Sequence, residues 1–188
     1  MDAKIDNIEF AEAAYKYKDS HIPYSKYDCQ AFVEKVLRDC GIKHNWRGSN
    51  HMWRDALDWK GTISECIAEW GGVPPGAWVF HVKHDGGERK HGYNDNEGNA
   101  SHVGIFCGPD LGVMHSTKGG VQLGPWPDEK RWTHVGLCKY IEYATQNTSD
   151  IIDMIDTCIE ALETLKRRLL DNDLRPDSEP AQSGIYAG

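Results

Sequence analysis

The spacing of apolar residues changes near residue 72, and this change limits the possible folds more than any other feature of the chain. Before it, apolar residues recur every three or four positions, as in amphipathic helices. After it, short segments rich in Val, Ile and aromatic residues alternate with Gly, Pro, Asn and Asp, as in strands joined by turns. Helices followed by a run of strands predict an α+β domain, with N-terminal helices packed on a central antiparallel sheet.

The same patterns predict the individual elements. Helices are expected over residues 8–18, 29–40, 50–59 and 63–69, and strands over 78–82, 101–107, 112–116, 121–123 and 135–143. Residues 84–99 are polar, rich in Gly and Asn, and long for a hairpin connection. Two interpretations of this stretch stay open, a mobile flap beside a site and an ordinary surface loop.

A different pattern begins after this domain, which we expect to span residues 1–145. Residues 146–172 predict an amphipathic helix whose apolar residues are spaced alternately by four and three, as in a heptad repeat: Ile151, Ile155, Cys158, Leu162, Leu165 and Leu169. So short a repeat is marginal alone. The helix is therefore expected either to pack on the domain or to mediate self-association. Residues 173–188 carry Pro, Ser and Gly and are predicted to be disordered.

Composition and charge exclude some classes of partner. The apolar fraction of 39% and the charged fraction of 27% are those of a globular protein. The formal charge of −8 would repel nucleic acid and anionic membranes. The chain shows no basic segment followed by an apolar run and no apolar stretch long enough to span a bilayer. We therefore expect synthesis in the cytoplasm without a secretory signal, no membrane span and no nucleic-acid partner.

One cysteine stands apart from the others by its position. The six cysteines include no C-x-x-C pair, which disfavours a zinc ribbon or a dithiol redox motif. Cys29 follows Asp28, which is placed to be an N-cap, and opens an amphipathic helix. The unpaired amides at a helix N-terminus favour an anion, and this environment lowers the pKa of a thiol. Taken alone, this position leaves Cys29 open to two interpretations, a nucleophile and a buried structural thiol, and the presence of a base decides between them.

Two histidines on consecutive strands could supply a base for Cys29. His102 begins an apolar strand directly after a polar loop, and His115 lies on the next strand. If Cys107 pairs with Gly112, Gly104 lies opposite His115 and both histidines point to the same face. A slip of one residue would turn His115 away. In this register His102 is predicted to act as the general base, with its ring oriented by His115.

The remaining histidines do not form a recognised ligand pattern. His81, His84 and His91 lie in or beside a Gly-rich loop, and their spacing matches no established zinc site. His134 is interpreted as an ordinary residue at the start of a strand. We therefore expect neither a metal nor a cofactor.

Three blocks of the sequence together resemble a known family. They are Asp28–Val33 (DCQAFV), Pro75–Phe80 (PGAWVF) and Ser101–Phe106 (SHVGIF), the last followed by Val113–Ser116 (VMHS). In order and spacing they are similar to the D-C-S-G-F-V, P-G-D-L-V-F-F and H-V-G-I-Y-x-G blocks, the last followed by V-H-A, of the NlpC family of bacterial cell-wall cysteine peptidases. The resemblance covers about residues 20 to 143.

The resemblance implies a papain-like, NlpC-type fold with a Cys nucleophile, a His base and a polar third residue, at positions that match Cys29, His102 and His115. It implies hydrolysis of peptidoglycan stem peptides, commonly at the bond after D-glutamate. Without a signal or a wall-binding repeat, the chain resembles prophage lysis or tail-associated enzymes. Two alternatives stay open: an amidase or acyltransferase with the same Cys–His pair, and a non-catalytic phage or secretion assembly protein that uses the C-terminal helix.

The sequence departs from the family on the substrate side. Gln30 and Ala31 replace the usual Ser and Gly, and the Gly-rich stretch before the Cys is shortened. By the resemblance, Tyr24 corresponds to a tyrosine that lines the substrate and oxyanion region, with Tyr27 as a rival. We expect Tyr24, Asp28 and Gln30 on the substrate side of the site.

Overall fold

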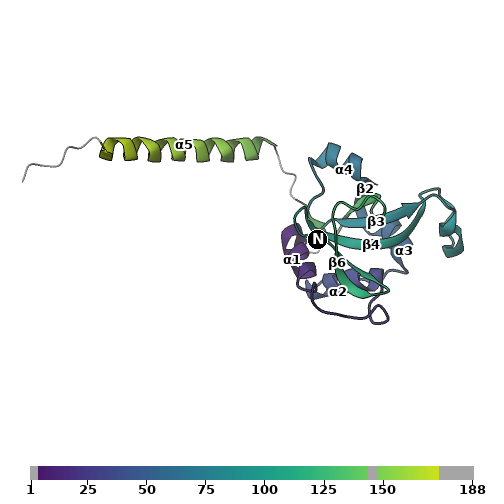
Figure 1. Ribbon diagram of the computed structural model, residues 1–188. Coiled ribbons are helices and arrows are strands. Elements are labelled where there is room, and N and C mark those ends of the chain that lie inside the picture. Colours follow the sequence, from purple (N-terminus) through teal and green to yellow (C-terminus); the bar gives the residue numbers. More distant parts are fainter. Residues whose placement is uncertain (1–3, 144–147, 174–188) are drawn as a thin grey trace, which may run out of the picture. The chain divides into compact units, whose positions relative to one another are not determined.

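The computed structural model describes residues 4–143 and 148–173, with the side chains of the second segment described from 155 to 169. The chain divides into two compact units, Met1–Thr145 and Gln146–Gly188. Figure 1 shows the elements of both units. The elements of the first are β1 (Ile5–Asp6), α1 (Asn7–Tyr15), α2 (Cys29–Asp39), α3 (Ser49–Asp55), β2 (Leu57–Thr62), α4 (Ile63–Trp70), β3 (Trp78–Lys83), the 3-10 helix η1 (Gly87–His91), β4 (Asn99–Gly108), β5 (Gly112–Thr117), β6 (Gly120–Gly124), β7 (His134–Cys138) and β8 (Ile141–Glu142).

A six-stranded sheet forms the centre of the first unit. Its strand order is β2-β7-β3-β4-β5-β6, and all neighbouring strands are antiparallel. The short strands β1 and β8 form a separate parallel pair. Helices and a mostly antiparallel sheet in one unit confirm the α+β prediction.

Alternating residues of β4 divide the core into two layers. Val103 and Ile105 belong to one buried cluster with Phe32 and Val33 of α2. Phe106 belongs to the other, together with residues of β3, β5, β7 and α4. Because successive strand side chains point to opposite faces, α2 packs on one face of β4, and the second cluster occupies the other face. The predicted packing of N-terminal helices on the sheet is therefore confirmed.

Two predicted elements differ from the structure. The helix expected over 50–59 ends at Asp55, and Leu57–Thr62 is the strand β2, paired along β7 from Cys138 to His134. Pairing with a distant strand overrides the local helical pattern here. The strand expected over 135–143 is divided into β7 and β8. Between them the carbonyl of Tyr140 accepts a hydrogen bond from the Ile5 amide at 3.0 Å.

The 84–99 loop is tied to α3 by one arginine. Arg54, whose side chain is 7% exposed, donates to the two carboxylate oxygens of Asp95 at 2.6 and 2.8 Å and to the carbonyl of Gly98 at 3.0 Å. The hydrogen bonds from Arg54 hold the pKa of Asp95 well below its usual range. The guanidinium also lies over the Tyr93 ring, 4.2 Å from its centroid. These contacts favour the interpretation of this stretch as an anchored surface loop over that of a mobile flap.

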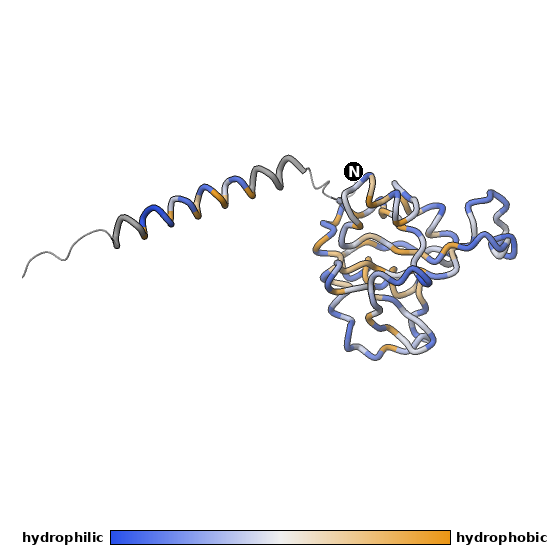
Figure 2. Tube along the Cα trace, turned by 45° about the horizontal axis from the view of Figure 1, so that its top comes forward, coloured by the Kyte–Doolittle hydropathy of each residue, from blue (hydrophilic) through white to orange (hydrophobic). Residues whose placement is uncertain are grey.

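The second unit contains the helix α5 (Thr148–Asp173), of 26 residues. Its described apolar side chains are 48–66% exposed: Ile155, Ile159, Leu162, Leu165 and Leu169. Figure 2 shows them recurring along the helix between hydrophilic residues. The side chain of Ile151 and the tail predicted to be disordered beyond residue 173 lie outside the described residues. In the described part of the chain, no helix is long and apolar enough to cross a membrane.

We expect Arg54→Met to loosen the 84–99 loop, because it removes the charged hydrogen bonds to Asp95 and Gly98. The free energy of unfolding should fall by about 2 kcal/mol, and limited proteolysis should cut within the loop faster than in the wild type. Arg89→Met, at an exposed position of the same loop, is the matched control and should change neither. Equal cleavage rates in the two variants would contradict the anchoring role of Arg54.

Candidate active site

Cys29 is held at the first position of α2. Asp28 caps the helix, and its Oδ1 accepts a hydrogen bond from the Ala31 amide at 2.8 Å, which confirms the predicted N-cap. The apolar stripe of α2, which includes Phe32 and Val36, is fully buried, and Cys29 itself is 9% exposed. The packing of this stripe on the sheet fixes the position of the thiol.

The thiol meets β4 at the backbone of Val103. The β4–β5 pairing runs from Gly104 to Gly108, so it ends just short of Val103. A hydrogen bond from the backbone of Val103, the residue after His102, lowers the pKa of the Cys29 thiol. The segment before α2 is fixed beside the neighbouring strands β6 and β5, because the Ile22 carbonyl accepts from the Val121 amide at 2.8 Å and the Tyr27 carbonyl accepts from Ser116 Oγ at 2.6 Å. Cys29 and His102 are therefore brought to the same end of β4.

His102 and His115 are hydrogen-bonded to each other. Their ring atoms Nε2 and Nδ1, respectively, lie 2.9 Å apart. Gly104 is the pairing partner of His115, as predicted. The last pair of the two strands is Gly108 with Gly112, and Cys107 lies at a register shift without a partner in this pairing. The expected Cys107–Gly112 pairing was therefore wrong, but the face shared by the two histidines is confirmed. His115 is fully buried.

Trp132 encloses the two histidine rings. Its ring stacks on His102 at 5.4 Å with an interplanar angle of 17° and meets His115 edge-on at 5.3 Å. A Cβ at Gly104 would lie 2.7 Å from Val113 Cγ1 and 3.0 Å from the Trp132 ring. Only glycine fits at that position without displacing one of these groups. Trp132 was not predicted as a site residue, since it lies in a loop with no periodic pattern.

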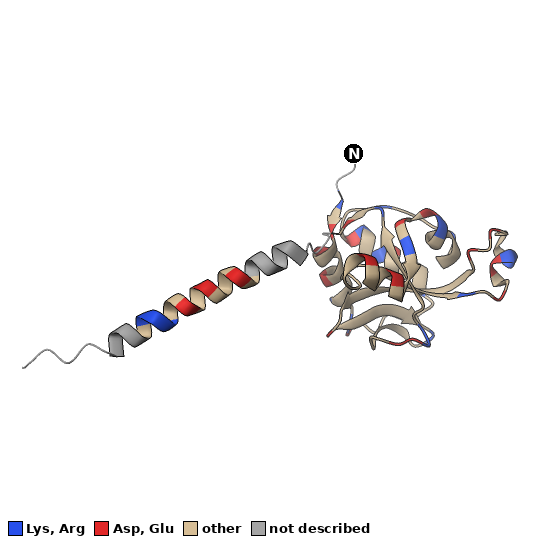
Figure 3. Cartoon of the chain, turned by 90° about the horizontal axis from the view of Figure 1, so that it is seen from above, with Lys and Arg blue, Asp and Glu red and all other residues tan. Residues whose placement is uncertain are grey.

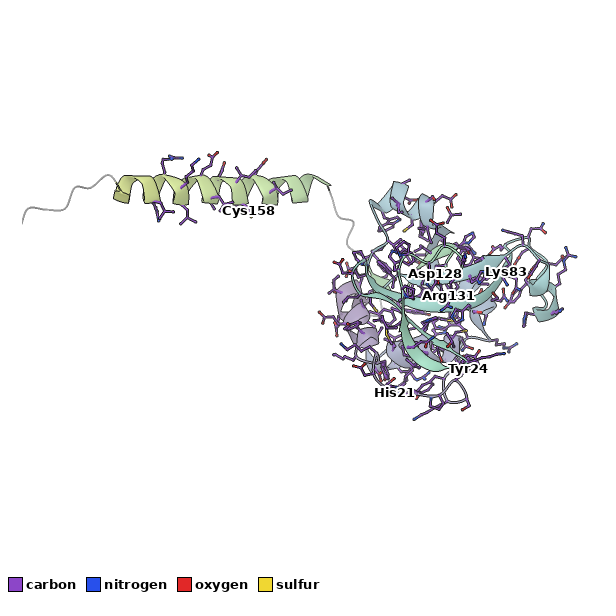
Figure 4. The ribbon with its side chains drawn as sticks, in the orientation of Figure 1. His21, Tyr24, Lys83, Asp128, Arg131 and Cys158 are labelled. Carbon is purple, nitrogen blue, oxygen red and sulfur yellow. The ribbon has the colours of Figure 1, made fainter. Side chains whose placement is uncertain are left out.

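Arg131 extends the row of rings, and it was not predicted as a site residue either. Its Nη1 lies 3.3 Å from His115 Nε2, and its Nε lies 3.7 Å from Asp128 Oδ2. Figure 4 shows Arg131 and Asp128 next to each other on the first unit. The site therefore contains one permanent cation at the far end of the histidine pair.

Burial determines the charges of the site. It raises the pKa of the Cys29 thiol, against the backbone hydrogen bonds that lower it. The net direction is opposite to the lowering expected from the helix N-terminus alone. Burial, followed by the charge of Arg131 and by His81, lowers the pKa of His102 to about 4. The pKa of His115 falls to about 3, through burial, His102 and Arg131. At neutral pH the unliganded site thus holds a protonated thiol and two neutral imidazoles.

The residues predicted on the substrate side have different environments. Tyr24 is 39% exposed, and its pKa is raised by burial and by the charges of Cys29 and Asp28, so it lies within electrostatic reach of the site. Figure 4 shows Tyr24 in the part of the unit that also holds His21. Gln30 donates through Nε2 to Glu34 Oε1 at 2.6 Å and to the Trp46 carbonyl at 2.9 Å. Its amide hydrogens are therefore used inside the protein, and only its backbone N–H faces Cys29.

The other histidines lie in separate surroundings. His81 is the pairing partner of His102 on β3, whereas His91 ends η1. His134, in β7, meets the Trp53 ring edge-on at 5.4 Å and contacts Thr133. Across residues 4–143 and the described part of α5, no three His, Cys, Asp or Glu side chains gather as metal ligands.

Comparison with known proteins adds no relative. No protein-family model matches the chain, and no curated protein matches it in sequence. The resemblance to the cell-wall peptidases therefore depends on the three sequence blocks alone.

Two neutral histidines, His115 fully buried and His102 partly buried, should make the protein sensitive to acid. Their pKa values in the folded state lie below the ordinary 6.5, so the unfolded chain binds more protons as the pH falls. The part of the free energy of unfolding that depends on these two histidines is fully present above about pH 6.5. It is lost as the pH falls toward 4 and then 3, by roughly 1.4 kcal/mol per pH unit for each histidine. Urea unfolding across this range should show a shallower pH dependence for the double variant His102→Gln/His115→Gln. Equal slopes in the two proteins would refute this account.

Proposed function

We propose that this chain is a cysteine hydrolase of the NlpC type, with a papain-like fold, that cleaves an amide bond in peptidoglycan stem peptides. One observation carries the catalytic part: a cysteine at a helix N-terminus lies beside the strand whose first residues include a histidine bonded to a second histidine. Nucleophile, base and orienting group in this order form the arrangement used for covalent acyl transfer.

The neutral resting charges define the order of the chemical steps. His102 takes the thiol proton of Cys29 through Nδ1, the ring nitrogen that His115 leaves unoccupied, as sulfur attacks the amide carbonyl. Backbone N–H groups at the start of α2 stabilise the oxyanion. His102 then gives the same proton to the leaving amine. In the second half of the reaction, deacylation, it activates the water that hydrolyses the thioester. The helix N-terminus is aligned to favour the anionic sulfur and oxygen that form during these steps.

The substrate class is supported by the sequence blocks rather than by the geometry. Blocks around Cys29, Ala77 and His102 resemble those of peptidases that act on stem peptides, commonly after D-glutamate. Tyr24 is half exposed and within electrostatic reach of Cys29 and Asp28, which supports a contact with such a peptide. A phage or prophage origin, with delivery to the cell wall, is part of the same proposal.

Cys29→Ala should abolish release of peptide fragments from purified peptidoglycan, because no other group replaces the nucleophile. His102→Ala should reduce the rate by at least about 100-fold, while Cys40→Ala and His134→Ala should retain activity. Mass spectrometry of the fragments identifies the bond: new peptide termini support a peptidase, and separation of intact stem peptides from the sugar indicates the amidase alternative. Undiminished digestion by Cys29→Ala would overturn the proposal.

A second candidate function, assembly through α5, is favoured by its exposed apolar side chains. Ile155, Leu162 and Leu169 recur at intervals of seven, as at one position of a heptad. The described charges are separated along the same helix: Asp156, Glu160 and Glu163 precede Lys166, Arg167 and Arg168 (Figure 3). A second copy in antiparallel orientation would place the acidic half beside the basic half.

We therefore expect the full chain to self-associate in sedimentation velocity experiments. Leu162→Glu should shift it to monomers, because a charge would be buried at the centre of the helix contact. Thr164→Gln, an exposed and uncharged position outside the apolar repeat, is the control and should leave the association unchanged. A wild-type chain that stays monomeric across the concentration range would exclude α5 self-association.

A further inference from the structure

Arg131 lies at the end of a hydrogen-bonded row that continues through His115 to His102. The contacts are Arg131 Nη1 to His115 Nε2 at 3.3 Å and His115 Nδ1 to His102 Nε2 at 2.9 Å. Both ring nitrogens of the fully buried His115 are therefore occupied. The proposed function uses His102 and His115 but assigns no role to Arg131.

The chemistry of the three side chains fixes where the protons lie. A guanidinium can only donate hydrogen bonds, so His115 Nε2 accepts from Arg131. Neutral His115 then carries its proton on Nδ1 and donates it to His102 Nε2. Because His102 Nε2 accepts, neutral His102 carries its proton on Nδ1. Each ring thus has one tautomer as long as Arg131 stays in contact.

This tautomer cannot perform the first catalytic step. With Nε2 bonded to His115, Nδ1 is the only ring nitrogen of His102 that can take the Cys29 proton, and it is already protonated. Nδ1 is freed when His115 carries its proton on Nε2 and accepts from His102 Nε2–H. That arrangement places an N–H against the guanidinium, so it requires Arg131 to move away.

We infer that Arg131 is a positioning residue that holds His115 and His102 in a resting tautomer, and that His102 becomes a base for Cys29 when Arg131 leaves His115. The inference rests on the proposed function.

The surroundings of Arg131 allow this movement. Its side chain is 41% exposed and lies 3.7 Å from Asp128 Oδ2, whose side chain is 25% exposed. Arg131 is also held through its backbone, because its amide donates to the Asp128 carbonyl at 3.0 Å. The guanidinium can therefore leave the buried ring while the loop keeps its place. Besides the Cys29 thiol, His81 on β3 faces His102, and it is neutral at pH 7 because burial lowers its pKa.

Nitrogen-15 NMR of the histidine rings at pH 7 tests the tautomer in the full chain without substrate. In the wild type His102 Nδ1 and His115 Nδ1 should resonate as protonated nitrogens and the two Nε2 atoms as unprotonated ones. Arg131→Met should reverse this pattern, and Arg131→Lys, which keeps a donor and a positive charge, should restore it. Lys130→Met, at the adjacent exposed residue, is the control. An unchanged pattern in Arg131→Met would overturn the inference.

Alkylation of Cys29 by iodoacetamide at pH 7 tests the link to reactivity. Arg131→Met should raise the rate by up to about tenfold, since the base-competent tautomer is no longer a minor state, and Lys130→Met should not. A reversed tautomer with an unchanged alkylation rate would overturn the link between Arg131 and Cys29. Failure of the proposed function gives a different result: Cys29→Ala would still digest peptidoglycan, while the ring resonances would continue to respond to Arg131→Met.

Discussion

The packing of α2 on β4 is the contact on which the rest of the site depends. It buries the apolar stripe of the helix against Val103 and Ile105. This packing determines the position of the helix along the strand and the direction of its N-terminus. Once this contact is fixed, Cys29 lies beside the backbone of Val103, the residue that follows His102. The antiparallel register of β4 with β5 then places His115 on the same face of the sheet as His102, within hydrogen-bond distance of its ring. Each member of the site is thus positioned by a buried element rather than by a loop, apart from Trp132 and Arg131.

The burial that gives this precision also removes charge from the site. A thiol and two imidazoles without free access to water favour their neutral forms, and Arg131 adds to this effect on both rings. The opposing influence is the helix N-terminus, which favours an anion on sulfur. In this molecule burial has the larger effect, so charge separation would occur during the attack on the substrate and not before it.

The local parts of this arrangement could be predicted from the sequence, and the non-local parts could not. Asp28 and Cys29 are recognisable from capping and amphipathic spacing alone. The relation between His102 and His115 follows from a single turn between adjacent strands, so one assumption about register was sufficient, even though the exact end of the ladder differs. By contrast, Leu57–Thr62 is a strand only because β7 lies beside it. The internal hydrogen bonds of the Gln30 side chain, which was expected on the substrate side, could not be predicted either, because its partner Trp46 comes from another part of the chain.

A buried, protonated thiol has a further consequence for the environments in which this protein could work. Oxidants such as peroxide attack the thiolate, and susceptibility follows thiolate character and exposure. Cys29 is 9% exposed and its pKa is raised by burial, so its sulfur is a poor target before a substrate is bound. Outside the reducing interior of a cell, a permanently ionised cysteine would be converted to sulfenic acid or a mixed disulfide. The proposed nucleophile is less open to this oxidation because its thiol stays protonated.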